Sequence, residues 1–304
     1  MDTRTLRYFL VTAQERNFTK AANKLCMAQP PLSRQIKLLE EELGVTLFIR
    51  NSRQLQLTEE GYFLKQQAEE ILLLIEKTEH QLEKMGNNDY GTISIGATES
   101  CGGSILPHLI EGFHEAAPHI RFQIWTGNSD EIQERLEKNL VDVAVVREPF
   151  NMEQYDRIFL NHEPWVIICN KEHFLAKRPE GVRVSELQDA SQIIPIRQPI
   201  QNEINSWFNE IASERNIFCL YNSITSVMGF AEHNLGVIIC PESAKNLINR
   251  ETLTYRKIID PVHESGTYLV KKHLQLMATA TEKFWKYVEH QTKSNPSKYK
   301  ESMR

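Results

Sequence analysis

The chain has 304 residues, of which 41% are hydrophobic and 25% charged, and its formal net charge is −5. This length suits two or three domains, and the composition is typical of a globular protein rather than a disordered one. No run approaches the roughly 18 to 20 uncharged apolar residues that a membrane span requires, and residues 1–6 lack the pattern of a secretory signal. We therefore expect a cytoplasmic protein with no membrane partner.

Charge is distributed unevenly along the chain. Residues 1–58 carry nine Lys or Arg against five Asp or Glu, a net charge of +4, whereas the remaining residues carry 26 against 35, a net charge of −9. A basic head on an acidic body is typical of a nucleic-acid reader joined to another kind of domain. The five cysteines are odd in number and widely spaced, which argues against a disulfide framework or a zinc site. We expect no metal and no cofactor.

Apolar spacing predicts three helices in the first 44 residues. The first helix has an inward stripe made of Leu6, Phe9, Leu10 and Ala13. Thr19 is a candidate cap for a second, short helix. Pro30 and Pro31 suit the first turn of a third helix, where missing amide protons cost little, and Gly44 suits its C-terminal end.

The third helix has one apolar face and one polar face. Its apolar face consists of Leu32, Ile36, Leu39 and Leu43, at spacings of 4, 3 and 4. At about 100° per residue, Pro30, Arg34 and Lys37 point the other way, and Ser33 flanks them. The C-terminal end is acidic, at residues 40–42, and phosphates would repel it. We therefore expect the N-terminal turns to enter a major groove, where Arg and Gln can read base edges.

The segment 47–57 predicts a two-stranded wing. Polar and apolar residues alternate near its end, and a turn-forming Asn51-Ser52 lies between Arg50 and Arg53. Both arginines suit phosphates or a narrow minor groove. The complete set of expected DNA-binding residues is Thr19, Gln29, Pro30, Ser33, Arg34, Lys37, Arg50 and Arg53.

These residues carry a specific resemblance. The strings in question are Phe18-Thr19-Lys20-Ala21-Ala22, Gln29-Pro30-Pro31-Leu32-Ser33-Arg34-Gln35-Ile36, Leu39-Glu40, Leu43-Gly44, Leu47-Phe48, Arg50 and Leu57-Thr58-Glu59-Glu60-Gly61. Together they resemble the N-terminal signature of the LysR-type transcriptional regulators. The resemblance implies a winged helix-turn-helix that binds double-stranded promoter DNA. The alternative is an ordinary three-helix bundle with solvated charges.

A long helix is predicted from Thr58, its candidate cap, to about Gly86. Apolar and small residues recur along it in a heptad seam: Leu64, Ala68, Ile71, Ile75, Thr78, Leu82 and Met85. The seam could pack on the protein's own body, but its narrowness and its charged flanks favour a second subunit. The expected dimerisation residues are Leu64, Ala68, Ile71, Ile75 and Leu82. The family resemblance implies a coiled-coil linker helix, a homodimer that assembles to a homotetramer, and contact with RNA polymerase if the protein is an activator.

After a polar hinge at residues 87–91, β-branched runs alternate with helical patterns. Strands are expected at 92–97, 120–126, 142–147, 165–169, 192–196, 217–221, 236–239 and 267–270, and helices at 104–116, 129–140, 202–215, 224–234 and 276–291. This order predicts parallel strands joined by crossover helices. The elements form two such α/β series, and a strand late in the chain returns to the first. This indicates two lobes, the first at about 91–163 and 267–291 and the second at about 164–266.

The whole chain is therefore expected to be α/β, with three parts and a tail. These are a DNA-binding domain at 1–58, a linker helix and hinge at 59–90, an effector domain at 91–291 and a disordered tail at 292–304. The effector domain is similar to the two-lobed periplasmic-binding-protein-like domain of the same family, through Ile105-Leu106-Pro107, Phe113, Pro118, Leu140-Val141-Asp142-Val143-Ala144 and Leu235-Gly236-Val237-Ile238. It departs from the family at residues 231–234, which replace a Gly-containing turn.

Ligands of open α/β folds collect at the carboxyl ends of strands, beside helix N-termini. Residues there predict a site for a small anion or polar metabolite, in which Arg197 can pair with a carboxylate. The expected effector-binding residues are Thr98, Ser100, Cys101, Asn128, Ser129, Arg147, Arg197 and Thr225. The hydroxyl and amide residues could instead be simple helix caps, and Arg147 could be a surface charge.

Two other functions compete with an effector-controlled regulator. A redox-sensing regulator would use Cys101, at a helix start that lowers the pKa of a thiol. A solute-binding protein would explain residues 91–291 but not the basic N-terminal part. Enzymatic activity is not expected, because the sequence has no His-Glu-x-x-His, Gly-x-Ser-x-Gly, phosphate-loop or dinucleotide-binding motif.

Overall fold

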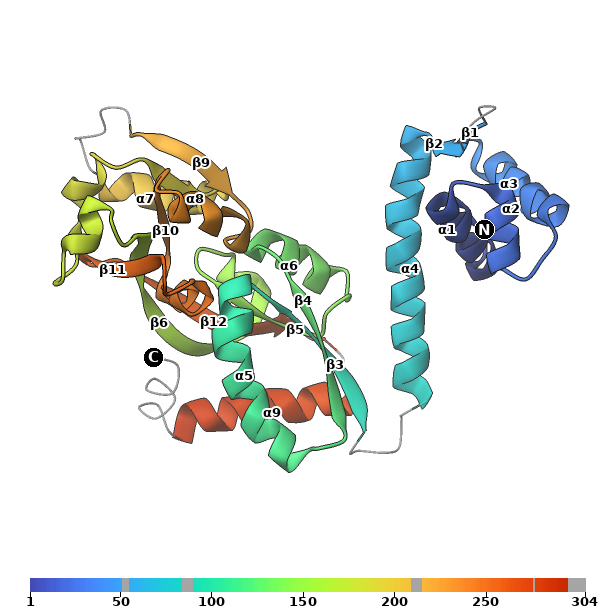
Figure 1. Cartoon of the computed structure of the whole chain (residues 1–304). Helices are drawn as coiled ribbons and strands as arrows, with labels where there is room; N and C mark the ends of the chain where they lie inside the picture. Colours follow the sequence, from blue (N-terminus) through green and yellow to red (C-terminus); the bar gives the residue numbers. More distant parts are fainter. Residues whose placement is uncertain (51–54, 84–89, 209–214, 276, 295–304) are drawn as a thin grey trace. The chain divides into compact units, whose positions relative to one another are not determined.

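The structure is a computed structural model, and it describes residues 1–50, 55–83, 90–208, 215–275 and 277–294. The chain divides into two compact units, Met1–Met85 and Gly86–Arg304 (Figure 1). Each unit has its own hydrophobic core, and each is described by itself.

The first unit combines a helical bundle with a small hairpin. Its elements are α1 (Thr3–Glu15), α2 (Phe18–Lys24), α3 (Gln29–Leu43), β1 (Phe48–Arg50), β2 (Leu55–Leu57) and α4 (Glu59–Glu83). β1 and β2 pair antiparallel, with Phe48 opposite Leu57. The predicted three helices and wing are confirmed, although the tip of the wing, including Arg53, lies outside the described residues.

Helix ends in this unit are set by short polar side chains. Asn17 caps α2, because its side-chain oxygen accepts a hydrogen bond from the Lys20 amide at 3.0 Å. The prediction that Thr19 caps this helix is wrong, since Thr19 already lies in the first turn. Thr58 caps α4 as expected, accepting from the Gly61 amide at 2.9 Å. Gly44 ends α3 with a φ of 70°, a conformation that glycine adopts without strain.

The core of the first unit is built from the predicted apolar stripes. Phe9, Leu32 and Ile36 are fully buried, and the Phe9 and Phe48 rings pack with centroids 5.4 Å apart. Leu43 departs from the prediction, because 37% of it remains exposed. The last turn of α3 therefore extends past the core.

The predicted heptad seam of α4 packs within this unit. Ala68 is completely buried, and Leu64 and Ile75 pack against the same core as Phe9. For Ala68 the alternative of packing on the protein's own body holds. Leu64 and Ile75 are only partly buried, so their part in dimerisation stays a prediction. Ile71 is 36% exposed, and the side chain of Leu82 lies outside the described residues.

The second unit is an α/β structure built on one long sheet. Its strands are β3 (Gly91–Ala97), β4 (Ile120–Thr126), β5 (Val143–Arg147), β6 (Tyr155–Asn170), β7 (Val182–Arg183), β8 (Gln192–Pro195), β9 (Ile217–Tyr221), β10 (Val237–Pro241), β11 (Leu253–Asp260) and β12 (Glu264–Lys272). Its α-helices are α5 (Glu99–Ala116), α6 (Ser129–Glu137), α7 (Gln198–Trp207), α8 (Met228–Glu232) and α9 (Thr279–Ser294), and its 3-10 turns are η1 (Met152–Gln154), η2 (Phe174–Lys177), η3 (Val184–Leu187), η5 (Thr225–Val227) and η6 (Glu242–Leu247).

The sheet has two halves that share β6. The strand order is β4-β3-β5-β12-β6-β10-β8-β9, with β11 beside β6 and β7. β6 pairs with β12 as far as Pro164 and with β10 from Trp165 onward. We call the half with β3, β4, β5 and β12 lobe I, and the half with β8, β9, β10 and β11 lobe II. Each lobe has separate apolar clusters, and in lobe I the helices α5 and α9 pack together on the sheet (Figure 1).

Several element boundaries differ from the predictions. Helix α5 begins at Glu99 rather than 104, so the predicted effector-binding residues Ser100 and Cys101 lie within the helix. The predicted helix at 224–234 is a 3-10 turn followed by the short α8, and the predicted tail begins inside α9. β11 and the first half of β6 were not predicted. At residues 231–234, where the family has a Gly-containing turn, Asn234 adopts a φ of 57°. Asn tolerates this conformation better than most residues.

Candidate effector pocket and nucleic-acid interface

The N-terminal turns of α3 present the polar surface that the sequence predicts. Gln29, Pro30, Arg34 and Lys37 are exposed, and Ser33 is half-buried beside them. This face exists because Leu32, Ile36 and Leu39 hold the other side of the helix in the core. Thr19, on α2, is also exposed. The side chains of Arg50 and Arg53 lie outside the described residues.

The acidic end of α3 contacts the start of the hairpin. One side-chain oxygen of Glu40 accepts hydrogen bonds from the backbone amides of Leu47 and Phe48, at 2.8 and 3.2 Å. These contacts fix the start of the hairpin against the helix. Lys37 lies 3.4 Å from Glu41 in an exposed ion pair, which is weak enough to exchange for a phosphate.

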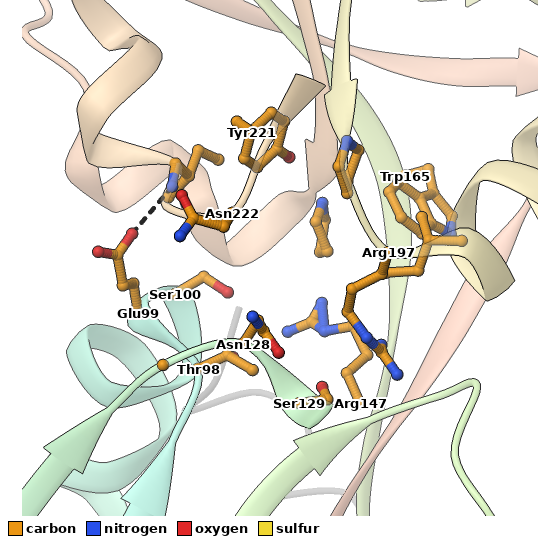
Figure 2. A pocket seen from close by; sticks show the side chains of 15 residues that line it. Thr98, Glu99, Ser100, Asn128, Ser129, Arg147, Trp165, Arg197, Tyr221 and Asn222 are labelled. Carbon is orange, nitrogen blue, oxygen red and sulfur yellow. Dashed lines mark hydrogen bonds between the residues drawn. The ribbon is translucent and has the colours of Figure 1, made fainter. Parts of the chain in front are cut away.

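A pocket of about 100 Å³ lies between lobe I and lobe II (Figure 2). It is lined by Thr98, Glu99, Ser100, Gly127, Asn128, Ser129, Arg147, Trp165, Pro195, Arg197, Ile200, Tyr221, Asn222, Ile224 and Pro241. Six of the eight predicted effector-binding residues belong to this lining, and Cys101 and Thr225 do not. An apolar cavity of about 150 Å³ accepts benzene. This pocket therefore suits a compact molecule.

The apolar wall of the pocket was not predicted. Trp165 is completely buried and packs edge-on against Trp207, with ring centroids 5.3 Å apart. Tyr221 is also buried, and its hydroxyl donates to the Ile239 carbonyl at 3.0 Å. Ile224 completes this wall. Apolar residues in strands and turns give no sequence signal that separates a pocket wall from an ordinary core, so only the tertiary structure reveals them.

The helix-cap alternative holds for Asn128 but not for Thr98. Asn128 accepts from the amides of Asp130 and Glu131, at 2.9 and 3.1 Å, and so caps α6. Thr98 occupies the equivalent position before α5, yet its side chain makes no cap hydrogen bond. The Thr98 hydroxyl oxygen is buried and has no partner among the described residues. Because such groups are costly to leave unpaired, Thr98 is a strong candidate for a ligand contact.

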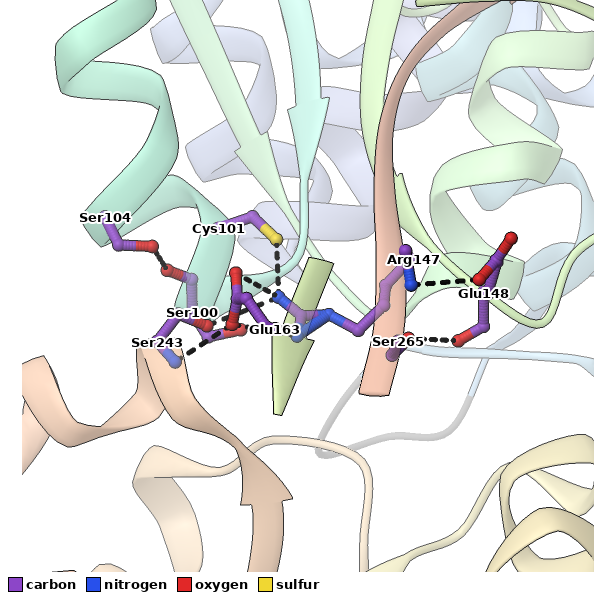
Figure 3. Close-up of polar contacts among 9 residues, drawn as sticks. Ser100, Cys101, Ser104, Arg147, Glu148, Glu163, Ser243 and Ser265 are labelled. Atoms are coloured by element: carbon purple, nitrogen blue, oxygen red, sulfur yellow. Dashed lines mark hydrogen bonds and ion pairs between the residues drawn. The ribbon is translucent and has the colours of Figure 1, made fainter. Parts of the chain in front are cut away.

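Arg147 is buried, so the alternative of a surface charge is wrong. Its guanidinium lies 3.2 Å from the Glu163 carboxylate and also donates to Ser243 at 3.3 Å (Figure 3). Burial alone would lower the pKa of Arg147, but Glu163 and Cys101 raise it above its usual value. Burial alone would raise the pKa of Glu163, but Arg147 and the Ser243 amide hold it below its usual value. The pair is therefore ionised on both sides.

Arg197 is the second buried guanidinium at the pocket. Its Nη2 donates to Asp130 at 2.6 Å and to the Pro149 carbonyl at 3.0 Å. Its Nε and Nη1 are buried and have no partner among the described residues. Only 7% of the side chain is exposed. Arg197 therefore offers unused donors at the wall of the pocket, as Thr98 does from the other lobe.

Cys101 does not have the environment that a redox sensor requires. It is completely buried in the first turn of α5, and its sulfur accepts a hydrogen bond from Arg147 at 3.1 Å. Cys169 and Cys240 are buried as well, and burial raises the pKa of the Cys169 thiol to about 11. Peroxide reaches exposed thiolates most readily. These observations give the redox alternative no support.

Of the helices described, none combines the length and the apolar character that crossing a bilayer takes. Within the described ranges, no three His, Cys, Asp or Glu side chains are grouped so that they could hold a metal ion.

Each of the two units matches a known protein family. Residues 3–62 match the bacterial regulatory helix-turn-helix protein of the lysR family, and residues 86–293 match the LysR substrate binding domain. A helix-turn-helix joined to a two-lobed binding domain defines an effector-responsive transcriptional regulator. The chain belongs to the LysR family, whose members are transcriptional regulators.

Individual relatives match between 79% and 97% of the chain. The transcriptional regulator BsdA of Bacillus subtilis is 32% identical over 79% of this chain and 84% of its own length. The crystal structure of full-length BenM is 27% identical, covers 97% of this chain and 98% of its own, and has a TM-score of 0.57. The crystal structure of the LysR family regulator CbnR covers 95% of this chain and 99% of its own, with a TM-score of 0.79 at 20% identity. CbnR supports the fold alone.

Proposed function

We propose that this regulator reads promoter DNA with the first turns of α3 and is controlled by a small acidic molecule held between its lobes. The observation that carries the effector part is the pair of unsatisfied donors, Thr98 in lobe I and Arg197 in lobe II, on opposite sides of one pocket. The proposed boundaries are 1–58 for the DNA-binding part, 59–90 for the linker and 91–291 for the effector part.

Four exposed or half-exposed side chains support the DNA contact. Arg34 and Gln29 can reach base edges, while Lys37 and Ser33 can hold phosphates. Thr19, Pro30, Arg50 and Arg53 complete the proposed surface. One related structure is described as CbnR complexed with its target DNA, and we propose the same kind of partner here. Since promoter DNA is the partner, the site of action is the cytoplasm.

The pocket favours a carboxylate with a compact apolar body. Unused N–H and O–H donors require an acceptor, and a carboxylate pairs well with a guanidinium. Trp165, Tyr221 and Ile224 supply an apolar wall for the rest of the molecule. Asn128, Ser129 and Ser100 remain proposed contacts from lobe I. No chemical step is proposed, because binding alone explains the pocket.

A homodimer is proposed through an exposed apolar face of α4, which keeps Ile71 of the predicted seam and adds Phe63 and Leu74. Phe63 is 68% exposed and Leu74 39% exposed, and with Ile71 they lie within about 80° of one another around the helix. An exposed apolar stripe of this kind favours a helix of a second copy. Dimers place two copies of α3 on an inverted repeat, and two dimers would form the tetramer. Phe63→Glu should yield a monomer in analytical ultracentrifugation, and an unchanged dimer mass would reject this face.

We propose that the effector selects one of two quaternary states and thereby changes the spacing of the α3 helices on DNA. If the protein activates transcription, RNA polymerase is a further partner. The test is to identify binding acids by isothermal titration and then to compare DNase footprints and small-angle scattering with and without the bound acid. Footprints and scattering that do not change when the acid is bound would refute this control mechanism.

A further inference from the structure

The carboxylate of Glu99 reaches across the pocket from lobe I to lobe II. Glu99 opens α5, and the loop at 223–225 follows β9. One Glu99 oxygen accepts from the hydroxyls of Ser223 and Thr225, at 2.8 and 3.3 Å. The other accepts from the amides of Ile224 and Thr225, at 2.9 and 3.4 Å, and Figure 2 draws the first of these two bonds. Two hydroxyls and two amides thus surround one carboxylate.

A second carboxylate makes the same kind of crossing. Asp130, in the first turn of α6 in lobe I, lies 2.6 Å from Arg197 in lobe II. The Asp130 side chain is 59% exposed, whereas that of Arg197 is almost fully buried. Glu99, Ile224 and Arg197 all line the pocket. The two bridges therefore join the lobes at the wall of the pocket.

The loop at 223–225 has the chemistry of a carboxylate receptor. Backbone amides and hydroxyls that converge on one carboxylate bind it by charge-assisted hydrogen bonds, which are stronger than neutral ones. Here the carboxylate belongs to the chain itself. A small acid offers the same group, so it could replace Glu99 only where the Glu99 side chain is absent or has moved away.

We propose that Glu99 is a built-in carboxylate ligand that latches lobe I to lobe II when no effector is bound. Asp130 reinforces this latch through Arg197. This inference rests on the proposed function, because it assigns the resting state of the same effector pocket. It also implies that an acidic effector competes with the protein's own carboxylates for donors in lobe II.

Hydrogen–deuterium exchange of the full-length protein tests the latch directly. The Ile224 and Thr225 amides donate to Glu99, so a peptide spanning 222–228 should be protected in the unaltered protein. In Glu99→Ala, exchange of this peptide should become faster by about tenfold or more. Sodium acetate should restore protection in Glu99→Ala, because acetate fits the vacated space, and sodium chloride at the same ionic strength should not.

Two further variants separate the latch from general damage. Glu111→Ala removes an exposed glutamate from the same helix and should leave peptide 222–228 unchanged. Glu99→Gln fills the space without charge. In this variant, peptide 222–228 should exchange faster than in the unaltered protein, and acetate should not change its exchange. The latch is refuted if peptide 222–228 exchanges equally in Glu99→Ala and the unaltered protein, or if acetate and chloride act alike. Promoter binding measured in parallel keeps this outcome distinct from a failure of the regulator function.

Discussion

The Arg147 guanidinium on β5 and the Glu163 carboxylate on β6 form an ion pair from which solvent is almost excluded, with side chains 5% and 7% exposed. The Ser243 amide of lobe II donates to the same carboxylate at 3.0 Å. Arg147 belongs to lobe I, and β6 passes through both lobes. The pair and its contact with Ser243 therefore join the two lobes (Figure 3), and Arg147 also lines the pocket.

Breaking this pair should strongly destabilise the second unit. Glu163→Gln or Arg147→Met leaves one buried charge without its partner, which costs about 3–5 kcal/mol. Urea unfolding followed by circular dichroism measures this loss as a lower free energy of unfolding. The double variant Arg147→Met with Glu163→Leu should lose much less, because no charge is then buried alone. Single variants as stable as the unaltered protein would contradict the ion pair.

Stability should depend on pH through Glu163. Its folded-state pKa lies below the usual value of 4.5, since Arg147 and Ser243 outweigh the effect of burial. Its contribution to stability is therefore fully present above pH 4.5 and is lost as the pH falls through the folded-state pKa. Thermal melts from pH 7 downward should show a steeper loss for the unaltered protein than for Glu163→Gln. Parallel curves below pH 4.5 would exclude Glu163 as the source.

In the first unit, a capping side chain should stabilise a helix only where the first turn has backbone amides that can donate to it. Asn17→Ala removes the hydrogen bond to the Lys20 amide and should cost about 1 kcal/mol. Ala28, at the start of α3, has no side-chain cap, and the residues two and three positions after it are Pro30 and Pro31, which have no amide proton. Ala28→Ser should therefore change stability by less than about 0.5 kcal/mol. Chemical unfolding measures the free energy of unfolding of both variants. A gain for Ala28→Ser as large as the loss for Asn17→Ala would contradict this prediction.

Arg197 should control the effector response rather than DNA affinity. Arg197→Ala removes the unused donors at the pocket, so an acid that binds the unaltered protein should bind at least about tenfold more weakly. Promoter binding without the acid should persist, since the α3 surface is unaltered. Isothermal titration and gel shift measure the two quantities. Equal affinity of both proteins for the acid would remove Arg197 from the proposed site.

Strands were predicted best where β-branched and aromatic residues run between clear breaks. The predicted bounds 120–126 and 217–221 are those of β4 and β9. β11 was missed because Arg256, Lys257 and Asp260 interrupt its apolar pattern. The start of α5 was missed because Gly102 and Gly103 disfavour helix, yet Cys101 is completely buried there. Tertiary packing overrode local propensity in that turn.

The pocket residues could be named from sequence only in part. Predicted helix starts led to Thr98, Asn128 and Arg197, but caps and ligand contacts have the same residue types. Only the structure separates the capping Asn128 from the unpaired Thr98. Glu99 could not be linked to Ile224, because the two are 125 residues apart in the chain. On α4, two apolar stripes share the helix, and periodicity alone does not say which stripe faces the core.

Promoter binding by Arg34→Glu tests the central claim most directly. Arg34 is exposed on α3, while Arg250→Glu supplies a matched charge reversal on an exposed site of the second unit. Gel shifts with the natural promoter should show affinity reduced by about fivefold to 150-fold for Arg34→Glu, since a base-reading arginine contributes about 1–3 kcal/mol. Arg250→Glu should bind like the unaltered protein. Undiminished promoter affinity of Arg34→Glu would contradict the assignment of α3 as the DNA-reading helix.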